Sequence, residues 1–171
     1  SIKNGFALLT EERRSTGIFS ILNIRENTVI SSLKKHRRGI WLSNRSMKKD
    51  TQWSIDAMHT KTPSQETKIR SLSGGNQQKV IIGRWLSEDM KVILLDDPTR
   101  GIEKKKKNEI YNVIYDLAKV GIAVVVVSSE LPEVLGIADR IMVMREGEIA
   151  GELSHDEANE VKALNLAMPA R

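Results

Sequence analysis

The sequence predicts an α/β protein with a largely parallel sheet, because apolar runs typical of buried strands alternate with helical patterns in its second half. "VILLD", residues 92–96, is a continuous apolar run that ends in a carboxylate, and "IAVVVV", residues 122–127, is another. Runs of this kind predict strands that are buried on both faces of a parallel sheet. Between them, apolar residues at i, i+3, i+4, i+7 and i+8 predict a helix. They are Ile110, Val113, Ile114, Leu117 and Ala118.

The rest of the chain adds a first strand, several helices and a hairpin. "GFALLT", residues 5–10, predicts a short strand, and the polar stretch around Pro63 predicts a connector. On a helix predicted over 46–60, Trp53, Ala57 and Met58 share one face, and we expect the tryptophans to pack in the core. The other predicted elements are helices over 24–35, 75–87 (amphipathic), 131–138 and 156–168, and a hairpin over 140–153 that turns at Glu146 and Gly147.

The composition is that of an ordinary globular domain and excludes several classes of protein. Of the 171 residues, 40% are hydrophobic and 29% are charged, and the longest apolar run is far shorter than the roughly 20 residues of a membrane-spanning helix. The absence of cysteine excludes disulfides and thiolate metal sites. The net charge is +5, but the basic clusters 34–38 and 103–107 lack interleaved aromatic residues. We therefore expect solvated faces and no nucleic-acid partner.

The segment "SLSGGNQQKV", residues 71–80, has the features of a phosphate-binding helix start. Gly74 and Gly75 let the backbone approach a ligand closely, and the first N–H groups of the predicted helix have no partners within it. These groups and the helix dipole favour an anion, and the Ser73 hydroxyl adds a donor. The alternative is that Ser73 only caps the helix and that the glycines form a tight turn.

Polar side chains also follow the two predicted buried strands. Asp96 ends the first strand, at the edge of the sheet where ligands of open α/β folds bind. It could hold Mg²⁺ while Asp97 orients an attacking water. Ser128 and Ser129 follow the second strand and could face the same phosphates. Alternatively, the aspartates are strand terminators and the serines cap the next helix. No pairing of the 3 histidines suggests a metal site.

Together, "LSGGNQQK", "VILLDDPTRGI" and "SSELPEVLGIADRI" resemble the nucleotide-binding domain of an ATP-binding cassette (ABC) transporter. The match is close to the second, C-terminal cassette of the tandem ATPases of carbohydrate importers, and "NGFALLTEERRSTGIF" resembles the galactose and methyl-galactoside branch. The resemblance implies a partial P-loop NTPase fold, with a helical signature-motif subdomain over about 12–90 and a Walker B core with a C-terminal hairpin and helix over about 91–171. Because no G-x-x-x-x-G-K-[ST] loop is present, we expect the C-terminal part of one cassette, truncated before the Q-loop region.

The resemblance also implies a site built from two cassettes. In this family two domains close face to face, and each ATP lies between the phosphate loop of one domain and the signature motif of the other. Ser73 and Gly75 would then hold the γ-phosphate of ATP bound to a partner cassette, and Gly74 and Gln77 would also belong to the cofactor-binding residues. By the same resemblance, Mg²⁺ would lie near Asp96.

Several positions depart from the family pattern. The resemblance makes Asp97 the catalytic carboxylate, but it replaces glutamate, and Ser129 stands at the position of the switch histidine. Glu11 stands where a glutamine usually senses the metal and contacts the transport subunit, and Glu103 stands where an aspartate usually bridges the two cassettes. A carboxylate that is one methylene shorter misplaces the attacking water. We therefore expect this chain's own site to hydrolyse ATP poorly and its signature motif to complete a competent site on the partner.

The resemblance implies the ATP-binding and ATP-hydrolysing subunit of a carbohydrate importer, with ATP and Mg²⁺ as cofactors. Its partners would be the first nucleotide-binding domain of the same full-length protein, transmembrane permease subunits and, indirectly, a periplasmic sugar-binding protein, at the cytoplasmic face of the bacterial inner membrane. The chain alone is expected to be inactive. Two alternatives stay open. One is an ABC-type ATPase of DNA repair or chromosome maintenance, although no sustained heptads occur. The other is a catalytically silent interaction module.

Overall fold

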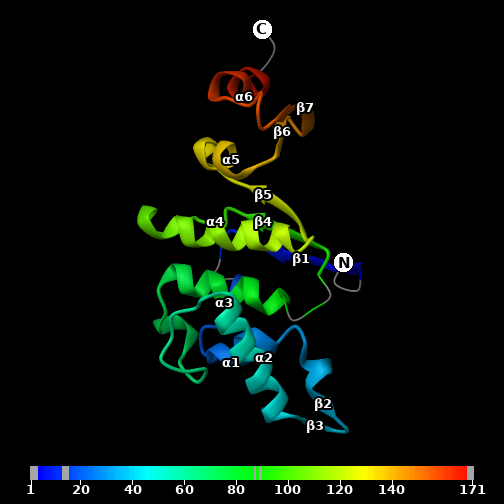
Figure 1. Ribbon diagram of the computed structural model, residues 1–171, viewed down its shortest axis with the longest axis vertical. Coiled ribbons are helices and arrows are strands. Elements are labelled where there is room, and N and C mark those ends of the chain that lie inside the picture. Colours follow the sequence, from blue (N-terminus) through cyan, green and yellow to red (C-terminus); the bar gives the residue numbers. More distant parts are fainter. Residues whose placement is uncertain (1–3, 13–15, 87, 89, 169–171) are drawn as a thin grey trace. The chain divides into compact units, whose positions relative to one another are not determined.

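The computed structural model describes residues 4–12, 16–86, 88 and 90–168. The chain forms two compact units, Ser1–Val126 (unit 1) and Val127–Arg171 (unit 2), and Figure 1 shows the elements of each. Among the described residues, no helix is both long and apolar enough to cross a membrane.

The predicted parallel sheet is built mainly by unit 1. Its strands are β1 (Phe6–Leu9), β4 (Val92–Asp96) and β5 (Ala123–Val127), in the order β1-β4-β5. β1 and β4 pair in parallel, with Leu9 opposite Leu95, and α4 (Lys104–Lys119) connects β4 to β5. This arrangement confirms the expected α/β fold class.

One face of the sheet is buried and the other is partly exposed. The buried face consists of Ala7, Leu9, Ile93 and Leu95. The exposed face carries Phe6, Leu8, Leu94 and Val125. The expectation of strands buried on both faces is therefore wrong for these strands. Successive side chains of a strand point to opposite faces, and the described helices cover only one of them, where α3 (Gly74–Leu86) packs against β1.

Three helices of unit 1 pack against one another: α1 (Ile24–Val29), α2 (Asn44–Ala57) and α3. α3 confirms the helix predicted from residue 75, and the expected last residue, Ser87, lies outside the described residues. Every residue of α3 from Gln77 to Arg84 is buried. The amphipathic character expected for this helix is therefore wrong, because α1, α2, α4 and β1 all contact it.

The helix predicted over 24–35 is interrupted. α1 ends at Val29, and the 3-10 helix η3 (Leu33–His36) follows after a turn. Ser32 Oγ donates a hydrogen bond to the Val29 carbonyl at 3.2 Å, and local bonds of this kind compete with a continuing helix. A two-stranded hairpin comes next, made of β2 (Arg37–Arg38) and β3 (Trp41–Leu42). The sequence pattern did not predict this hairpin.

α2 and α3 approach each other through small residues. A Cβ atom added at Gly83 would lie 2.2 Å from Ser54 Oγ and 3.2 Å from Met58 Cγ. Ser54 and Met58 are buried, whereas Trp53 and Ala57 are exposed. The apolar face predicted for α2 is therefore wrong except at Met58, because the close contact with α3 selects small side chains.

Unit 2 is a hairpin with two helices. Its elements are α5 (Leu131–Ile137), β6 (Arg140–Arg145), β7 (Glu148–Ser154) and α6 (Glu160–Ala167). β6 and β7 are antiparallel, and Glu146 and Gly147 at the turn have φ of 51° and 86°, as a type I′ turn requires. Ile141, Val143, Leu153 and Ala163 form its core. The predicted hairpin, its turn residues and both helices are confirmed.

Candidate functional site

The signature segment, residues 71–80, runs from the end of η4 (Ile69–Ser71) into α3. The fully buried Ile69 side chain fixes the position of η4. The Ser73 carbonyl accepts a hydrogen bond from the Gln77 amide at 2.9 Å, and Ser73 Oγ accepts one from Asn76 Nδ2 at 3.1 Å. Ser73 therefore directly precedes α3 and accepts its first backbone bond through the carbonyl, and its side chain is exposed at the helix start. Capping and phosphate binding are compatible roles for this residue.

Gly75 has room for a side chain within this chain. A Cβ atom added there would meet only Ile102 Cγ2, at 4.0 Å, which is ordinary van der Waals contact. Gly75 lies inside α3 and has no positive φ, so neither packing nor backbone conformation requires glycine. Alanine would favour the helix. Glycine at this position is what the close approach of a ligand to the backbone requires.

The Gln77 side chain forms hydrogen bonds to the backbone that precedes α3. Its side chain is 4% exposed, and Nε2 donates hydrogen bonds to the carbonyls of Ile69 at 3.3 Å and Leu72 at 3.1 Å. The nucleotide contact expected for Gln77 stays a prediction, and in the structure its side chain is directed to these two carbonyls. The buried amide holds the backbone that leads to Ser73.

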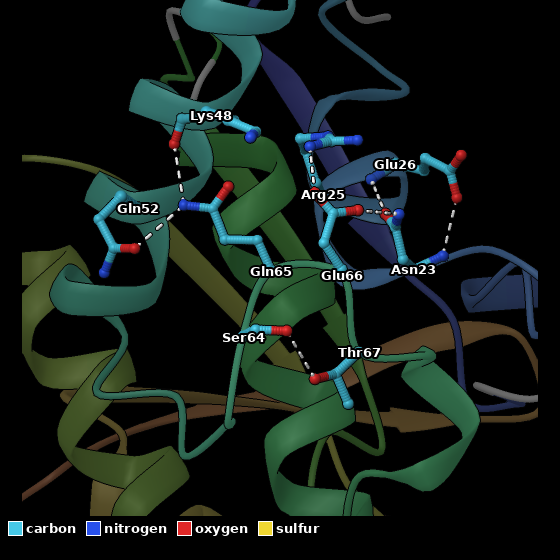
Figure 2. A network of polar contacts seen from close by, with 9 residues as sticks. All are labelled: Asn23, Arg25, Glu26, Lys48, Gln52, Ser64, Gln65, Glu66 and Thr67. Atoms are coloured by element: carbon cyan, nitrogen blue, oxygen red, sulfur yellow. Dashed lines mark hydrogen bonds and ion pairs between the residues drawn. The ribbon is translucent and has the colours of Figure 1, made fainter.

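A polar network fixes the connector around Pro63, which precedes the signature segment in the sequence (Figure 2). Glu66 forms an ion pair with Arg25 of α1 and accepts a hydrogen bond from Asn23 Nδ2 at 2.9 Å. The neighbouring Gln65 donates through Nε2 to the Lys48 carbonyl of α2 at 3.0 Å. The polar connector predicted from the sequence is thus bonded to both helices. These contacts fix the position at which the chain enters the signature segment.

An ion pair between a buried lysine and a half-exposed glutamate connects α3 to α4. Lys79 Nζ lies 2.5 Å from Glu109 Oε2 and 3.3 Å from the His59 carbonyl, and only 3% of Lys79 is exposed. Lys61 Nζ lies 3.6 Å from Glu109 Oε1. The hydrogen bond from Lys79 is the main reason that the pKa of Glu109 is lowered. Sequence reasoning missed this pair, although a lysine directly before the apolar run from Val80 was a signal for it.

Three of the predicted acidic residues of unit 1, Glu11, Asp96 and Asp97, follow or end strands at the carboxyl edge of the sheet. Asp96 ends β4, and Glu11 follows β1 at the same edge because the two strands are parallel. Glu11 forms an ion pair with Arg100, in the turn after β4. Asp97 has φ of 42°, in the left-handed region that short polar residues tolerate best, and its carbonyl accepts a hydrogen bond from the Arg100 amide at 3.0 Å.

The donors at this edge fit a metal ion that shares its ligands with phosphate. Among the residues that the structure describes, no group of three or more His, Cys, Asp or Glu side chains could hold a metal ion by itself. Mg²⁺ is commonly bound by one or two carboxylates together with water and substrate phosphates. The half-buried Asp96, at the end of its strand, is the residue that would hold it.

Glu103 and Ser129 lie at the starts of two other elements. Glu103 precedes α4, its side chain is 74% exposed, and Lys106 Nζ lies 2.9 Å from its carboxylate. Ser129 belongs to unit 2 and is exposed between β5 and α5. The neighbouring Ser128 Oγ accepts a hydrogen bond from the Glu130 amide at 3.1 Å. The N-cap residue of α5 is Glu130, and it makes no side-chain cap hydrogen bond, so the alternative interpretation in which the serines cap the next helix is wrong.

Comparison with known proteins identifies the family. The family model described as "ABC transporter" matches residues 2–100. The chain is 53% identical over 168 residues to the galactose/methyl galactoside import ATP-binding protein MglA of Fusobacterium nucleatum, and 55% identical over 170 residues to the arabinose import ATP-binding protein AraG of Shigella flexneri. These matches cover 98% and 99% of the chain but 34% of each relative. The chain therefore spans about a third of the length of these relatives.

Solved structures have the same fold. The ADP conformation of the ATP-binding cassette MJ1267 matches with a TM-score of 0.77 and 21% identity, over 96% of this chain and 68% of that one. The dimeric post-hydrolysis state of the cassette MJ0796, bound to ADP and Pi, matches with a TM-score of 0.72 and 24% identity, over 88% and 62%. The sheet order, the signature segment and the family match agree, and the chain belongs to the ABC transporter family.

Proposed function

We propose that this chain is part of the ATP-binding subunit of an ABC importer that hydrolyses ATP to transport a monosaccharide. The support is the high identity to two import ATP-binding proteins across nearly the whole chain. Their names give galactose and arabinose, so the proposal is for a monosaccharide of this kind rather than for galactose alone. The subunit would work at the cytoplasmic face of the inner membrane, with permease subunits and, indirectly, a periplasmic sugar-binding protein.

The start of α3 is the single observation that carries the mechanism. Ser73 is exposed there, and among the described residues a Cβ atom at Gly75 would meet only Ile102, at 4.0 Å. In the proposal, Ser73, Gly74 and Gly75 bind the terminal phosphate of ATP held by the other nucleotide-binding domain of the full-length protein. The helix start supplies N–H donors and a favourable dipole, and Gln77 keeps the loop in place.

The sheet edge supplies the second part of the proposal. Asp96 would hold Mg²⁺, which polarises the phosphates of bound ATP, and Asp97 would orient water. Because Asp97 is shorter than glutamate and Ser129 lacks an imidazole, we expect this chain's own site to be slow. Glu11, tied to Arg100, would contact the transport subunits, and the exposed Glu103 would face the other cassette.

The first test compares two substitutions in the full-length importer. Ser73→Arg should lower the rate of ATP hydrolysis by about 100-fold or more, because a long cationic side chain fills the place of the phosphate donors. Asp97→Ala should lower it far less, because the proposed competent site uses the carboxylate of the other cassette. Phosphate release by the reconstituted complex measures both rates.

A matched control places the same new side chain at another helix start. Asn44→Arg changes the exposed first residue of α2 and should leave ATP hydrolysis unchanged. Equal losses from Ser73→Arg and Asp97→Ala would contradict the unequal sites. A loss from Asn44→Arg as large as that from Ser73→Arg would contradict the assignment of the signature segment.

A further inference from the structure

The hairpin of β2 and β3 exposes a tip of large apolar side chains. Ile40, Trp41 and Leu42 are 83%, 74% and 48% exposed, although isoleucine and leucine are among the residue types most often buried. Figure 1 shows the hairpin at the end of unit 1 that lies away from β1 and β4. Residues 33–49, which contain the hairpin and its flanks, are called the basic hairpin segment below.

Hydrogen bonds hold the hairpin in this form. The Ser43 amide donates to the His36 carbonyl at 2.8 Å, and Nδ1 of the buried His36 ring lies 3.0 Å from Ser46 Oγ in α2. At the turn, Gly39 has φ of 62°, and Arg37 Nε donates to its carbonyl at 2.6 Å. The apolar tip is therefore presented by a hydrogen-bonded turn and not by a frayed end.

The same segment concentrates the positive charge of the chain. Its cationic residues are Lys34, Lys35, Arg37, Arg38, Arg45, Lys48 and Lys49, and it contains no aspartate or glutamate. Subtracting these seven charges from the net charge of +5 leaves −2 for all other residues. The segment therefore carries a local excess of positive charge, and residues 104–107 form a second basic cluster. One of the seven, Lys35, is paired with Glu88 at 3.6 Å.

We propose that the basic hairpin segment binds the surface of a bilayer that contains anionic phospholipid. An exposed tryptophan beside aliphatic side chains suits the interface between headgroups and acyl chains, and surrounding lysines and arginines attract the anionic headgroups. The charge of the segment and of such a surface is complementary. The proposal concerns residues outside the nucleotide site and does not depend on the proposed function.

Nucleic acid fits this surface less well. Single-stranded nucleic acid is bound by stacking successive bases on several aromatic rings. The basic hairpin segment has one such ring, Trp41, beside the aliphatic Ile40 and Leu42. An acidic protein surface, such as that of a permease, would match the charge, and the test separates it from lipid by using vesicles that contain no other protein.

Co-sedimentation of the purified protein with vesicles tests the proposal. The protein should sediment with vesicles of phosphatidylcholine and phosphatidylglycerol, should not sediment with phosphatidylcholine alone, and should be released by salt. Ile40→Ser combined with Trp41→Ser should lower partitioning by about tenfold or more, because two apolar side chains no longer enter the interface. Arg38→Gln should lower it by roughly fivefold.

The matched control is Trp53→Ser on α2, which removes another exposed tryptophan outside the segment and should leave partitioning unchanged. In the variant Trp53→Phe/Trp85→Phe, Trp41 is the remaining tryptophan of 3, and its emission should shift to shorter wavelength when anionic vesicles are added. The proposal is overturned if the protein ignores anionic vesicles at low salt, or if Trp53→Ser matches the double variant. Binding that needs a permease in the vesicle, or that prefers single-stranded DNA to vesicles, also overturns it.

Discussion

Single residues around the signature segment serve it in different ways. Gly75 leaves space at the surface of α3, whereas Gln77 is buried and holds the incoming loop through two backbone carbonyls. Lys79 ties the same helix to α4 through Glu109. The sequence motif alone assigns Gln77 to the ligand, because a polar residue next to a phosphate-binding glycine gives no indication of which way its side chain points.

Gly75→Ala should separate stability from activity. The new methyl group meets only an ordinary contact with Ile102, so the free energy of unfolding should stay equal or rise by up to about 1 kcal/mol. The rate of ATP hydrolysis by the full-length importer should nevertheless fall, because the methyl group obstructs the approach of the phosphate. Urea unfolding and phosphate release measure the two quantities. An unchanged hydrolysis rate would show that the space beside Gly75 is not used by a ligand.

Glu109→Gln should make the stability less dependent on pH. The folded state lowers the pKa of Glu109 from 4.5, chiefly through the hydrogen bond from Lys79, so the ionised carboxylate stabilises the fold above the ordinary carboxyl pKa. That contribution is lost as the pH falls through the lowered value. Because the Glu109 side chain is 42% exposed, solvent screens the pair, so at pH 7 the variant should be less stable by about 0.5 kcal/mol or less, and the difference should vanish in acid.

Unfolding followed against pH checks this expectation. Glu148→Gln, which changes an exposed carboxylate at the start of β7, is the control and should leave the pH dependence of unfolding unchanged. A difference between Glu109→Gln and the unmodified chain that stays constant down to acidic pH would contradict the role of the charge.

At the level of elements, the helices of unit 1 are fixed by close packing and by buried polar contacts. Gly83 of α3 faces Ser54 of α2, and Arg84 donates through Nε to the Asn27 carbonyl of α1 at 2.7 Å. Burial lowers the pKa of Arg84 to about 10. These contacts bring small and polar side chains into the interior, where an apolar pattern would not locate them.

Gly83→Ala should destabilise the chain although alanine favours helices. The added Cβ would lie 2.2 Å from Ser54 Oγ, and overpacking of this kind costs about 1–3 kcal/mol of unfolding free energy. Ser54→Ala removes that oxygen and leaves Ser54 Cβ at 3.5 Å from the added atom. Combined with Gly83→Ala, it should restore a large part of the loss in urea unfolding. Losses that simply add in the double variant would rule out this contact as the cause.

The elements differ in how far the sequence predicts them. β4, β7 and α6 follow from local patterns, and the turn at Glu146 and Gly147 follows from turn chemistry. The break after Val29, the hairpin before α2 and the exposure of Trp53 do not follow. The exposure of Trp53 is decided by a tertiary contact, since Ser54 is the residue of α2 that faces Gly83 of α3. A local hydrogen bond from Ser32 accompanies the break after Val29.

For the whole molecule, some features of the candidate site can be predicted from the sequence and others depend on the fold. The position of Asp96 at a sheet edge follows from the apolar run before it. The ion pair between Glu11 and Arg100 and the link from Lys79 to Glu109 join residues far apart in the sequence, so only the fold reveals them. Ser73 is exposed at the start of the signature segment, and in the proposed function the second half of the nucleotide site comes from another domain.

The most direct test introduces a single thiol into this chain, which has no cysteine. In the full-length importer with any other cysteines removed, Ser73→Cys should react with a water-soluble maleimide about tenfold or more slowly in the presence of ATP than with ADP, because a bound nucleotide of the partner domain covers it. Ser64→Cys in the connector should react equally with both nucleotides, and the 171-residue chain by itself should show no ATP protection at Ser73→Cys. Equal reaction rates with ATP and ADP in the full-length protein would contradict the account.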